Sequence, residues 1–262
     1  PIRQMVESLG WRGTILVLAL VALVIAVLLF WLVPLRSSEQ KQHRTQHGII
    51  KGLKAVTTNL QTWICSIIGF GMASTMLAFG GLWGVPWLNN VHGYTTTEAA
   101  AVTSMLFVGW AIFSPLCGWA SDRMGRRNII LLAGSITALA ALTSLIFYTP
   151  VNTALLMLLI FVIGASGSAM TVCFGSVKEL NDVNYSSTSL GLMNMCIVGS
   201  GAVMQPLIGW LLDLNWNGEM LDGARVYSAS NYTVALGSLL VTNLMALIAA
   251  LFLRDTHCRQ VA

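Results

Sequence analysis

The stretch that decides the fold is residues 118–127, which read Gly118-Trp119-Ala120-Ser121-Asp122-Arg123-Met124-Gly125-Arg126-Arg127. It lies between two apolar runs, and each run is long enough to cross a bilayer, which takes about 20 helical residues. A strongly basic turn between two such runs must be a short loop at the water interface. Short cytoplasmic loops are enriched in Lys and Arg, so the three arginines of this turn indicate the cytoplasmic side.

The composition excludes an ordinary soluble domain. The chain is 56% hydrophobic and 9% charged, whereas soluble domains carry about 25% charged residues. The net charge of +4 is explained by membrane topology, so we expect no nucleic-acid partner. The five cysteines occur singly, without a CxxC pair or a metal-ligand spacing. We therefore expect reduced, structural cysteines and no metal site.

Seven apolar runs are long enough to span a membrane, which predicts an all-α multi-pass membrane protein. Backbone groups in lipid must satisfy their own hydrogen bonds, so these runs are expected to be helices rather than open strands. The runs cover roughly residues 13–35, 63–88, 99–120, 128–148, 154–177, 187–212 and 232–253.

The basic residues are distributed unevenly over alternate loops. Eleven of the 14 fall on the side of the Arg-rich turn, and the other three, Arg3, Arg12 and Arg225, fall on the opposite side. By the positive-inside rule, we expect the turn and the C-terminus to be cytoplasmic. The expected location is the inner (cytoplasmic) membrane. The eleven are Arg36, Lys41, Arg44, Lys51, Lys54, Arg123, Arg126, Arg127, Lys178, Arg254 and Arg259.

The pattern G-x-x-x-D-R-x-G-R-R in residues 118–127 resembles the signature loop of the major facilitator superfamily, a large family of secondary transporters. The chain is also similar to bacterial metabolite permeases. The resemblance implies a six-helix bundle of inverted three-plus-three repeats, preceded by one further helix. Residues 1–36 would be helix six with its periplasmic lead-in. Residues 37–62 would be a cytoplasmic inter-domain loop holding a surface helix, and residues 63–262 the C-terminal bundle.

An internal repeat agrees with this architecture. The frame P-L-x-G-W-x-x-D occurs at residues 115–122 and again at residues 206–213. By the loop count, the first copy ends in the cytoplasm and the second outside. Two related helices of opposite orientation are what an inverted repeat predicts. The chain also opens on Pro1 without an initiator Met, so we expect a piece of a longer transporter whose partner is its N-terminal six-helix half.

The first candidate site is a charged cluster around the Arg-rich turn. Asp122 ends a predicted helix, where a carboxylate can accept hydrogen bonds from a neighbouring helix N-terminus. Arg126 or Arg127 can pair with Glu179 or Asp182. The resemblance implies that such a cluster latches the outward-facing state. For Asp122 we favour this latch over interfacial anchoring, whereas anchoring explains Arg123 and Arg127 equally well. The predicted latch comprises Asp122, Arg123, Gly125, Arg126, Arg127 and Glu179.

The second candidate site is a cavity lined by polar and aromatic side chains within the spans. Trp110 lies in mid-span, unlike the tryptophans near span ends. Asn194 and Gln205 share one helix face, and amides inside a membrane require a partner or a water-filled cavity. A stripe through Thr75 is followed by glycines that suit an extracellular gate. Ordinary interhelical packing is the alternative for each feature. The predicted lining comprises Thr75, Phe79, Trp83, Trp110, Thr171, Asn194 and Gln205.

The spans contain no group suited to catalysis. No Asp, Glu, Lys, Arg or His lies deep in a run, and there is no Walker-type phosphate-binding motif. An intramembrane protease or metalloenzyme needs such groups, so we expect neither an enzyme nor a cofactor. The predicted function is half of a secondary active transporter that moves a small organic solute across the lipid bilayer by alternating access. A non-transporting membrane interaction protein on the same fold is the alternative.

Overall fold

The computed structural model describes residues 2–32, 49–148, 152–214, 216–221 and 224–260. The chain divides into two compact units, residues 1–48 and residues 49–262. Both units are helical, and the second also contains one short antiparallel pair of strands. The predicted all-α architecture is confirmed.

The first unit contains α1, Ile2–Leu32. Its backbone leaves helical geometry at Gly10, where φ is +69° and ψ is 166°. Glycine adopts this conformation readily because it has no Cβ. Beyond Gly10 the helix is almost wholly apolar, and Ser8–Leu32 is long enough to span a membrane. Residues 33–35, at the end of the predicted run, lie outside the described residues.

The second unit begins with α3 (Ile49–Thr58), which falls within the predicted inter-domain loop. Six further segments of membrane-spanning length follow, so the seven predicted spans are confirmed. In order, these segments are α4 (Leu60–Ser74) with the π-helix η1 (Thr75–Trp83) and α5 (Gly84–His92); α6 (Thr96–Met124); α7 (Arg127–Phe147); α8 (Thr153–Gly167) with the 3-10 helix η2 (Ser168–Thr171) and α9 (Val172–Glu179); the 3-10 helix η3 (Val183–Tyr185) with α10 (Ser186–Leu214); and α11 (Ala229–Phe252). Strands β1 (Met220–Leu221) and β2 (Ala224–Arg225) pair between α10 and α11.

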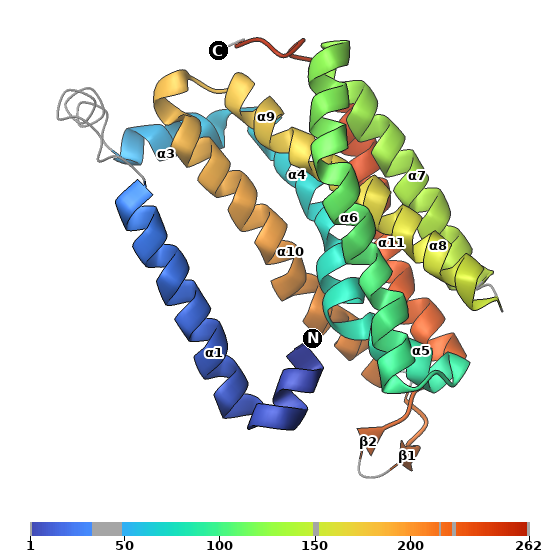
Figure 1. Cartoon of the computed structure of the whole chain (residues 1–262). Helices are drawn as coiled ribbons and strands as arrows, with labels where there is room; N and C mark the ends of the chain where they lie inside the picture. The colour runs from blue at the N-terminus through green and yellow to red at the C-terminus, as the bar shows by residue number, and fades with distance from the viewer. Residues whose placement is uncertain (1, 33–48, 149–151, 215, 222–223, 261–262) are drawn as a thin grey trace. The chain divides into compact units, whose positions relative to one another are not determined.

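In this unit α4 packs against both α10 and α11, and α7 packs against both α8 and α11. Figure 1 shows α10 running alongside α4. The closest approach is between α6 and α8. A Cβ added at Gly164 would lie 1.8 Å from the Leu106 carbonyl oxygen, and one added at Gly109 would lie 2.2 Å from the Phe161 carbonyl oxygen. Small residues permit such backbone contact between membrane helices.

The stripe through Thr75 and the glycines that follow it, Gly80, Gly81 and Gly84, coincide with a π-helix of nine residues, Thr75–Trp83, and the start of α5. The π-helix continues directly from α4 and into α5, so the segment changes its hydrogen-bond register without a loop (Figure 1). A Cβ at Gly84 would lie 2.8 Å from the Phe79 carbonyl oxygen, so the glycine allows the tight register change. π-helical turns are rare and frequently occur at functional sites.

A very short turn joins α6 to α7 and positions the charged cluster. Gly125 is left-handed, with φ +62°, and Arg126 is extended. The amides of these two residues donate to the carbonyls of Asp122 and Ser121, at 3.3 Å each. The turn therefore places Arg127 at the first position of α7, directly beside the end of α6.

Candidate functional site: the Arg127 cluster and the helix midpoints

Arg127 is the centre of a group that we call the Arg127 cluster: Ser121, Asp122, Arg127, Glu179, Asp255 and Thr256. Its Nη2 lies 2.6 Å from Glu179 Oε1, and its Nε donates to Glu179 Oε2 at 3.3 Å. Two parallel bonds of this kind form the strong, planar pairing that guanidinium groups make with carboxylates. Nη1 donates to Asp122 Oδ1 at 2.6 Å and to Ser121 Oγ at 3.2 Å.

The two carboxylates in contact with Arg127 differ in exposure. The side chains of Arg127 and Glu179 are 11% and 14% exposed, whereas that of Asp122 is 66% exposed. Solvent therefore screens the Asp122 contact much more than the Glu179 contact. Loss of one partner from the Arg127–Glu179 pair would leave a largely buried charge without compensation.

Gly175 on α9 makes room for the guanidinium. A Cβ at this position would lie 3.1 Å from Arg127 Cζ. The side chain of Arg127 thus lies flat against the α9 backbone one turn before Glu179. Gly175 was not among the predicted site residues, because nothing in the local sequence shows which side chain lies over it.

Asp122 contacts the first residue of the neighbouring helix α7 through a side chain and not through a backbone amide. We expected this carboxylate to accept from a helix N-terminus, and it accepts from Arg127 Nη1. The carboxylate that accepts from the first amide of α7 is Asp255, whose Oδ1 lies 3.2 Å from Arg127 N. The next residue, Thr256, donates its hydroxyl to Glu179 Oε2. Both residues follow the last span, and the sequence analysis missed them.

The other charged residues near the turn have different surroundings. Arg123 lies over the ring of Trp119, with Cζ 5.3 Å from the ring centroid. This cation–π geometry fits an interfacial anchor. Arg126 is the residue that precedes α7, and Asp182 accepts from the amide of Asn184 at 2.8 Å. Of the four Arg–carboxylate pairings considered, the structure contains Arg127–Glu179.

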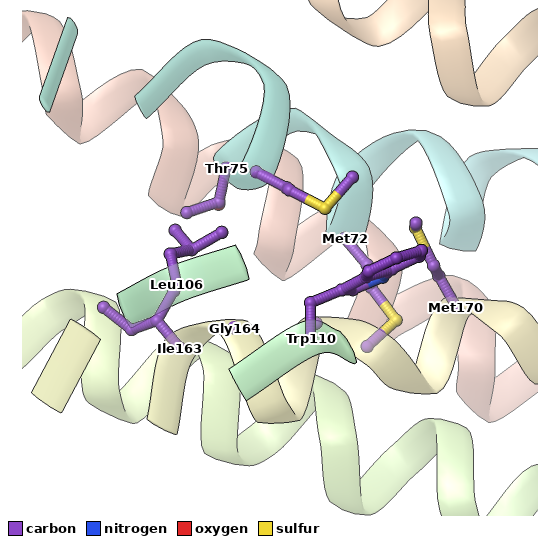
Figure 2. A pocket seen from close by; sticks show the side chains of 9 residues that line it. Met72, Thr75, Leu106, Trp110, Ile163, Gly164 and Met170 are labelled. Atoms are coloured by element: carbon purple, nitrogen blue, oxygen red, sulfur yellow. The ribbon is translucent and has the colours of Figure 1, made fainter. Parts of the chain in front are cut away.

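A small cavity lies near the middle of three spans, where α4 continues into η1, beside α6, and where α8 continues into η2. Its volume is about 10 Å³, roughly the space of one water molecule. Within the described part of the chain, the buried indole N–H of Trp110 has no hydrogen-bond partner. Figure 2 shows the Trp110 ring beside the side chains of Met72 and Met170. The lining residues are Met72, Thr75, Met76, Leu106, Trp110, Ile163, Gly164, Gly167 and Met170.

Of the predicted lining residues, Trp110 and Thr75 share this cavity. The Thr75 hydroxyl accepts from Asn243 Nδ2 of α11 at 2.9 Å. Phe79 is fully buried and packs edge-to-face on Trp87, with ring centroids 5.6 Å apart. Phe79 is therefore a core residue in this structure, and the packing alternative describes it. Thr171 donates to the Ser168 carbonyl of its own segment at 2.9 Å.

Of the three remaining predicted lining residues, Gln205 and Trp83 form an interhelical hydrogen-bond pair at the π-helix. Gln205 Nε2 donates to the Leu77 carbonyl at 2.9 Å, and Trp83 Nε1 donates to the Gln205 carbonyl at 3.0 Å. Interhelical bonding therefore describes Gln205 and Trp83. Asn194, on the same helix as Gln205, is exposed. The structure thus gives the two amides of α10 different surroundings.

The model of the Major Facilitator Superfamily matches residues 4–199, about three quarters of the chain. The chain belongs to the major facilitator superfamily. It is also 29% identical, over 240 residues, to a gentisate transporter of Corynebacterium glutamicum. The match covers 88% of this chain and 53% of that protein, so the chain spans about half the length of this relative. With its seven apolar helices, it is a multi-pass membrane protein of this family.

The second copy of the internal repeat carries its own ion pair. Asp213, the counterpart of Asp122, pairs with Arg225 at 2.7 Å and accepts from the Tyr227 hydroxyl at 2.6 Å. Arg225 Cζ lies 4.7 Å from the ring centroid of Trp216. Burial, followed by the bond to Asp213, raises the pKa of Tyr227, so this phenol stays a neutral donor. Both copies of the repeat in this family member therefore end in an aspartate paired with an arginine.

Asn243 is a further buried polar residue that the sequence analysis missed. Its amide donates to Thr75 Oγ1 and to the Leu239 carbonyl, both at 2.9 Å. The signal was present, because an amide inside the apolar run 232–253 is as unusual as one in residues 187–212. In the described residues, no group of three or more His, Cys, Asp and Glu side chains is placed to hold a metal ion.

Proposed function

We propose that the protein is part of a secondary active transporter that moves a small organic solute across the inner membrane by alternating access. In this mechanism one helical bundle rocks against another around a site near the bilayer midplane. Residues 63–262 would form the C-terminal bundle, residues 1–36 the preceding helix and residues 37–62 the inter-domain loop. The partner would be the N-terminal six-helix half of the same transporter. The match covers 53% of the gentisate transporter, so the chain has the length needed for one such bundle and the helix before it.

The observation that carries the solute proposal is the free indole N–H of Trp110. Leaving a buried donor without an acceptor is unfavourable, and a solute oxygen would satisfy it. The neighbouring Met72 and Met170 thioethers favour contact with an aromatic ring. The relative is named a gentisate transporter, and gentisate is a planar ring with a carboxylate and hydroxyl groups. We therefore propose aromatic hydroxy acids as the first solutes to test.

The cavity at Trp110 is too small for such a solute, because it holds about one water molecule. Solute binding would therefore require the exposed polar surface of α10, including Asn194, and movement of the helices that flank Trp110. This is the behaviour expected of a site that forms fully in one conformation of an alternating-access cycle.

The Arg127 cluster would lie on the cytoplasmic side. Eleven of the 14 basic residues fall on that side in the loop count. There the cluster would latch the outward-facing state, because its ionic contacts join the adjacent ends of α6, α7 and α9. The exposed Asp122 contact is the most easily broken of these and would open first.

The test is solute uptake by the full-length transporter in vesicles, with gentisate, benzoate and an aliphatic acid as alternative solutes. Trp110→Phe keeps a ring and removes the donor, so we expect KM for gentisate to rise about tenfold or more. Trp119→Phe, at an exposed position, is the matched control. Binding of solutes without uptake of any of them would favour the non-transporting alternative.

A further inference from the structure

We propose that residues 254–260, which follow the last helix, form a clasp that keeps the Arg127 cluster assembled, with Asp255 and Thr256 as positioning residues. The clasp itself is a statement about contacts within this chain. Its effect on the conformational cycle rests on the proposed transport function.

The clasp supplies a hydrogen-bond acceptor to the N-terminus of α7. The first amides of a helix have no partner within the helix. Asp255 accepts from the amide of Arg127, the first residue of α7, at 3.2 Å. A carboxylate at this position is also favoured by the helix dipole. Asp255 thus holds the backbone from which the central guanidinium extends.

The clasp also orients the carboxylate of Glu179. One oxygen of its carboxylate accepts from Arg127 Nη2, and the other accepts from both Arg127 Nε and the Thr256 hydroxyl. Thr256 is buried. Its hydroxyl therefore restricts rotation of the carboxylate about its last bond, and this restriction favours the two-bond pairing with Arg127.

The clasp also presents hydrogen-bond donors to the C-termini of two helices, where carbonyls lack intrahelical partners. Cys258 Sγ donates to the Ser121 carbonyl at 3.6 Å, and His257 Nδ1 lies 3.3 Å from the Gly125 carbonyl oxygen, both at the end of α6. At the end of α9, Gln260 Nε2 donates to the carbonyls of Lys178 and Asn181. The clasp therefore bridges the ends of three helices with the polarity that each end requires.

The backbone of the clasp contains a left-handed turn. His257 and Cys258 are consecutive non-glycine residues with φ of +49° and +57°. A left-handed conformation is unfavourable for residues with a Cβ and persists where the surroundings hold it. The Arg259 amide closes this turn on the Thr256 carbonyl at 3.1 Å. A freely moving tail would relax from this geometry, so the contacts of the clasp hold it in place.

The test is hydrogen–deuterium exchange on the full-length protein in lipid nanodiscs, read in peptides that cover residues 121–130 and 175–182. Thr256→Val keeps the volume and removes the hydroxyl, and Asp255→Ala removes the acceptor. We expect either change to speed exchange in both peptides about threefold to tenfold. Thr256→Ser should restore the wild-type rate, because it retains the donor.

Arg259→Gln is the matched control, since it changes one exposed charge in the same segment, and its rates should stay within about twofold of wild type. If Thr256→Val does not fold, Gln260→Ala tests the clasp at its exposed edge and should speed exchange in peptide 175–182. Unchanged exchange in Thr256→Val and Asp255→Ala, with uptake intact in the wild type, would overturn the clasp. Faster exchange in a protein that transports no solute would support the clasp and overturn the proposed function.

Discussion

Arg127 on α7 and Glu179 on α9 face each other through two bonds, 2.6 Å from Nη2 to Oε1 and 3.3 Å from Nε to Oε2. They are 52 residues apart in the chain and join the first residue of α7 to the last residue of α9. This pair is the least exposed ionic contact in the described residues, so it defines the geometry of the charged cluster.

Replacement of Arg127 should separate the role of its charge from that of its shape. Arg127→Gln leaves Glu179 largely buried without a counter-charge, so we expect a loss of about 3–5 kcal/mol in the free energy of unfolding. Arg127→Lys keeps the charge and loses the planar fork, so we expect a smaller loss. Denaturant titration in detergent micelles measures both. Arg123→Gln, at the neighbouring cation–π contact, is the control, and equal losses in all three variants would contradict the central role of Arg127.

Asp122→Asn should change the conformational balance more than the stability. The carboxylate is 66% exposed, so its contact with Arg127 should contribute at most about 1 kcal/mol to folding. A shift of similar size in the balance between states would still change the populations by about fivefold. The balance between the states is measured by the rate at which a thiol reagent labels single cysteines introduced on the two faces of α10. Unchanged accessibility and unchanged uptake would leave Asp122 only an anchoring role.

Replacement of the two amides of α10 by leucine should affect different properties, stability at Gln205 and solute uptake at Asn194. Gln205→Leu removes the donor to the Leu77 carbonyl, so we expect a loss of about 1–3 kcal/mol in stability. Asn194 is exposed, so Asn194→Leu should leave stability nearly unchanged and should reduce solute uptake. Thermal unfolding and vesicle uptake are measured on the same preparations. Equal stability of the two variants would contradict the different surroundings found for these amides.

Cys258 should be a slowly reacting thiol at neutral pH. Burial raises its pKa above the ordinary value of 9.0; Arg127 opposes this shift, and the nearby carboxylates Glu179, Asp122 and Asp255 reinforce it. A raised pKa favours the protonated form in the folded state. The stabilisation is therefore present below about pH 9 and lost as the pH rises through the folded-state pKa.

Alkylation by a maleimide, which requires the thiolate, measures this in a protein that lacks Cys65, Cys117, Cys173 and Cys196. The rate at Cys258 should still be rising above pH 9. A single exposed cysteine, made by Arg259→Cys together with Cys258→Ser, should reach its full rate at lower pH. Identical pH profiles at the two positions would show that Cys258 is not enclosed by the cluster.

Gly164→Ala should be strongly destabilising, because its Cβ would lie 1.8 Å from the Leu106 carbonyl oxygen. Overpacking of this kind typically costs about 1–3 kcal/mol, and backbone that cannot yield raises the cost. Gly199→Ala is the control, because no atom lies within 4 Å of its added Cβ and alanine favours helix. Thermal unfolding of both variants tests this, and a tolerated Gly164→Ala would mean that α6 and α8 are not in backbone contact.

The helices and their approximate ends were predictable, because membrane spans depend on local composition. The family was also recognisable, since its charged loop is contiguous in sequence. The pairing of Arg127 with Glu179 was one of four alternatives, and only the fold selects among them. Asp255 and Thr256 were not predictable, because a polar segment after the last span gives no signal of where it folds back.

The cavity residues show a different limit. Helical periodicity identifies which residues share a face, but it does not identify what covers that face. Phe79 and Thr75 belong to one stripe, yet one lies in the core and the other reaches the cavity. Asn194 and Gln205 diverge because a π-helical carbonyl lies opposite only one of them. The register change that exposes this carbonyl is a tertiary feature that the glycines permit but do not specify.

The reciprocal contacts at Gly109 and Gly164 restrict how this bundle can move. The backbones of α6 and α8 are in contact at these two glycines. If one helix slid along the other by one residue, a side chain would be forced against a carbonyl group. We therefore expect α6 and α8 to move as a rigid pair, and Trp110 on α6 to move with them. The contact between α4 and α10 differs, because the side chains of Met193 and Ile197 lie against Gly69, and contacts through side chains permit small sliding movements between helices.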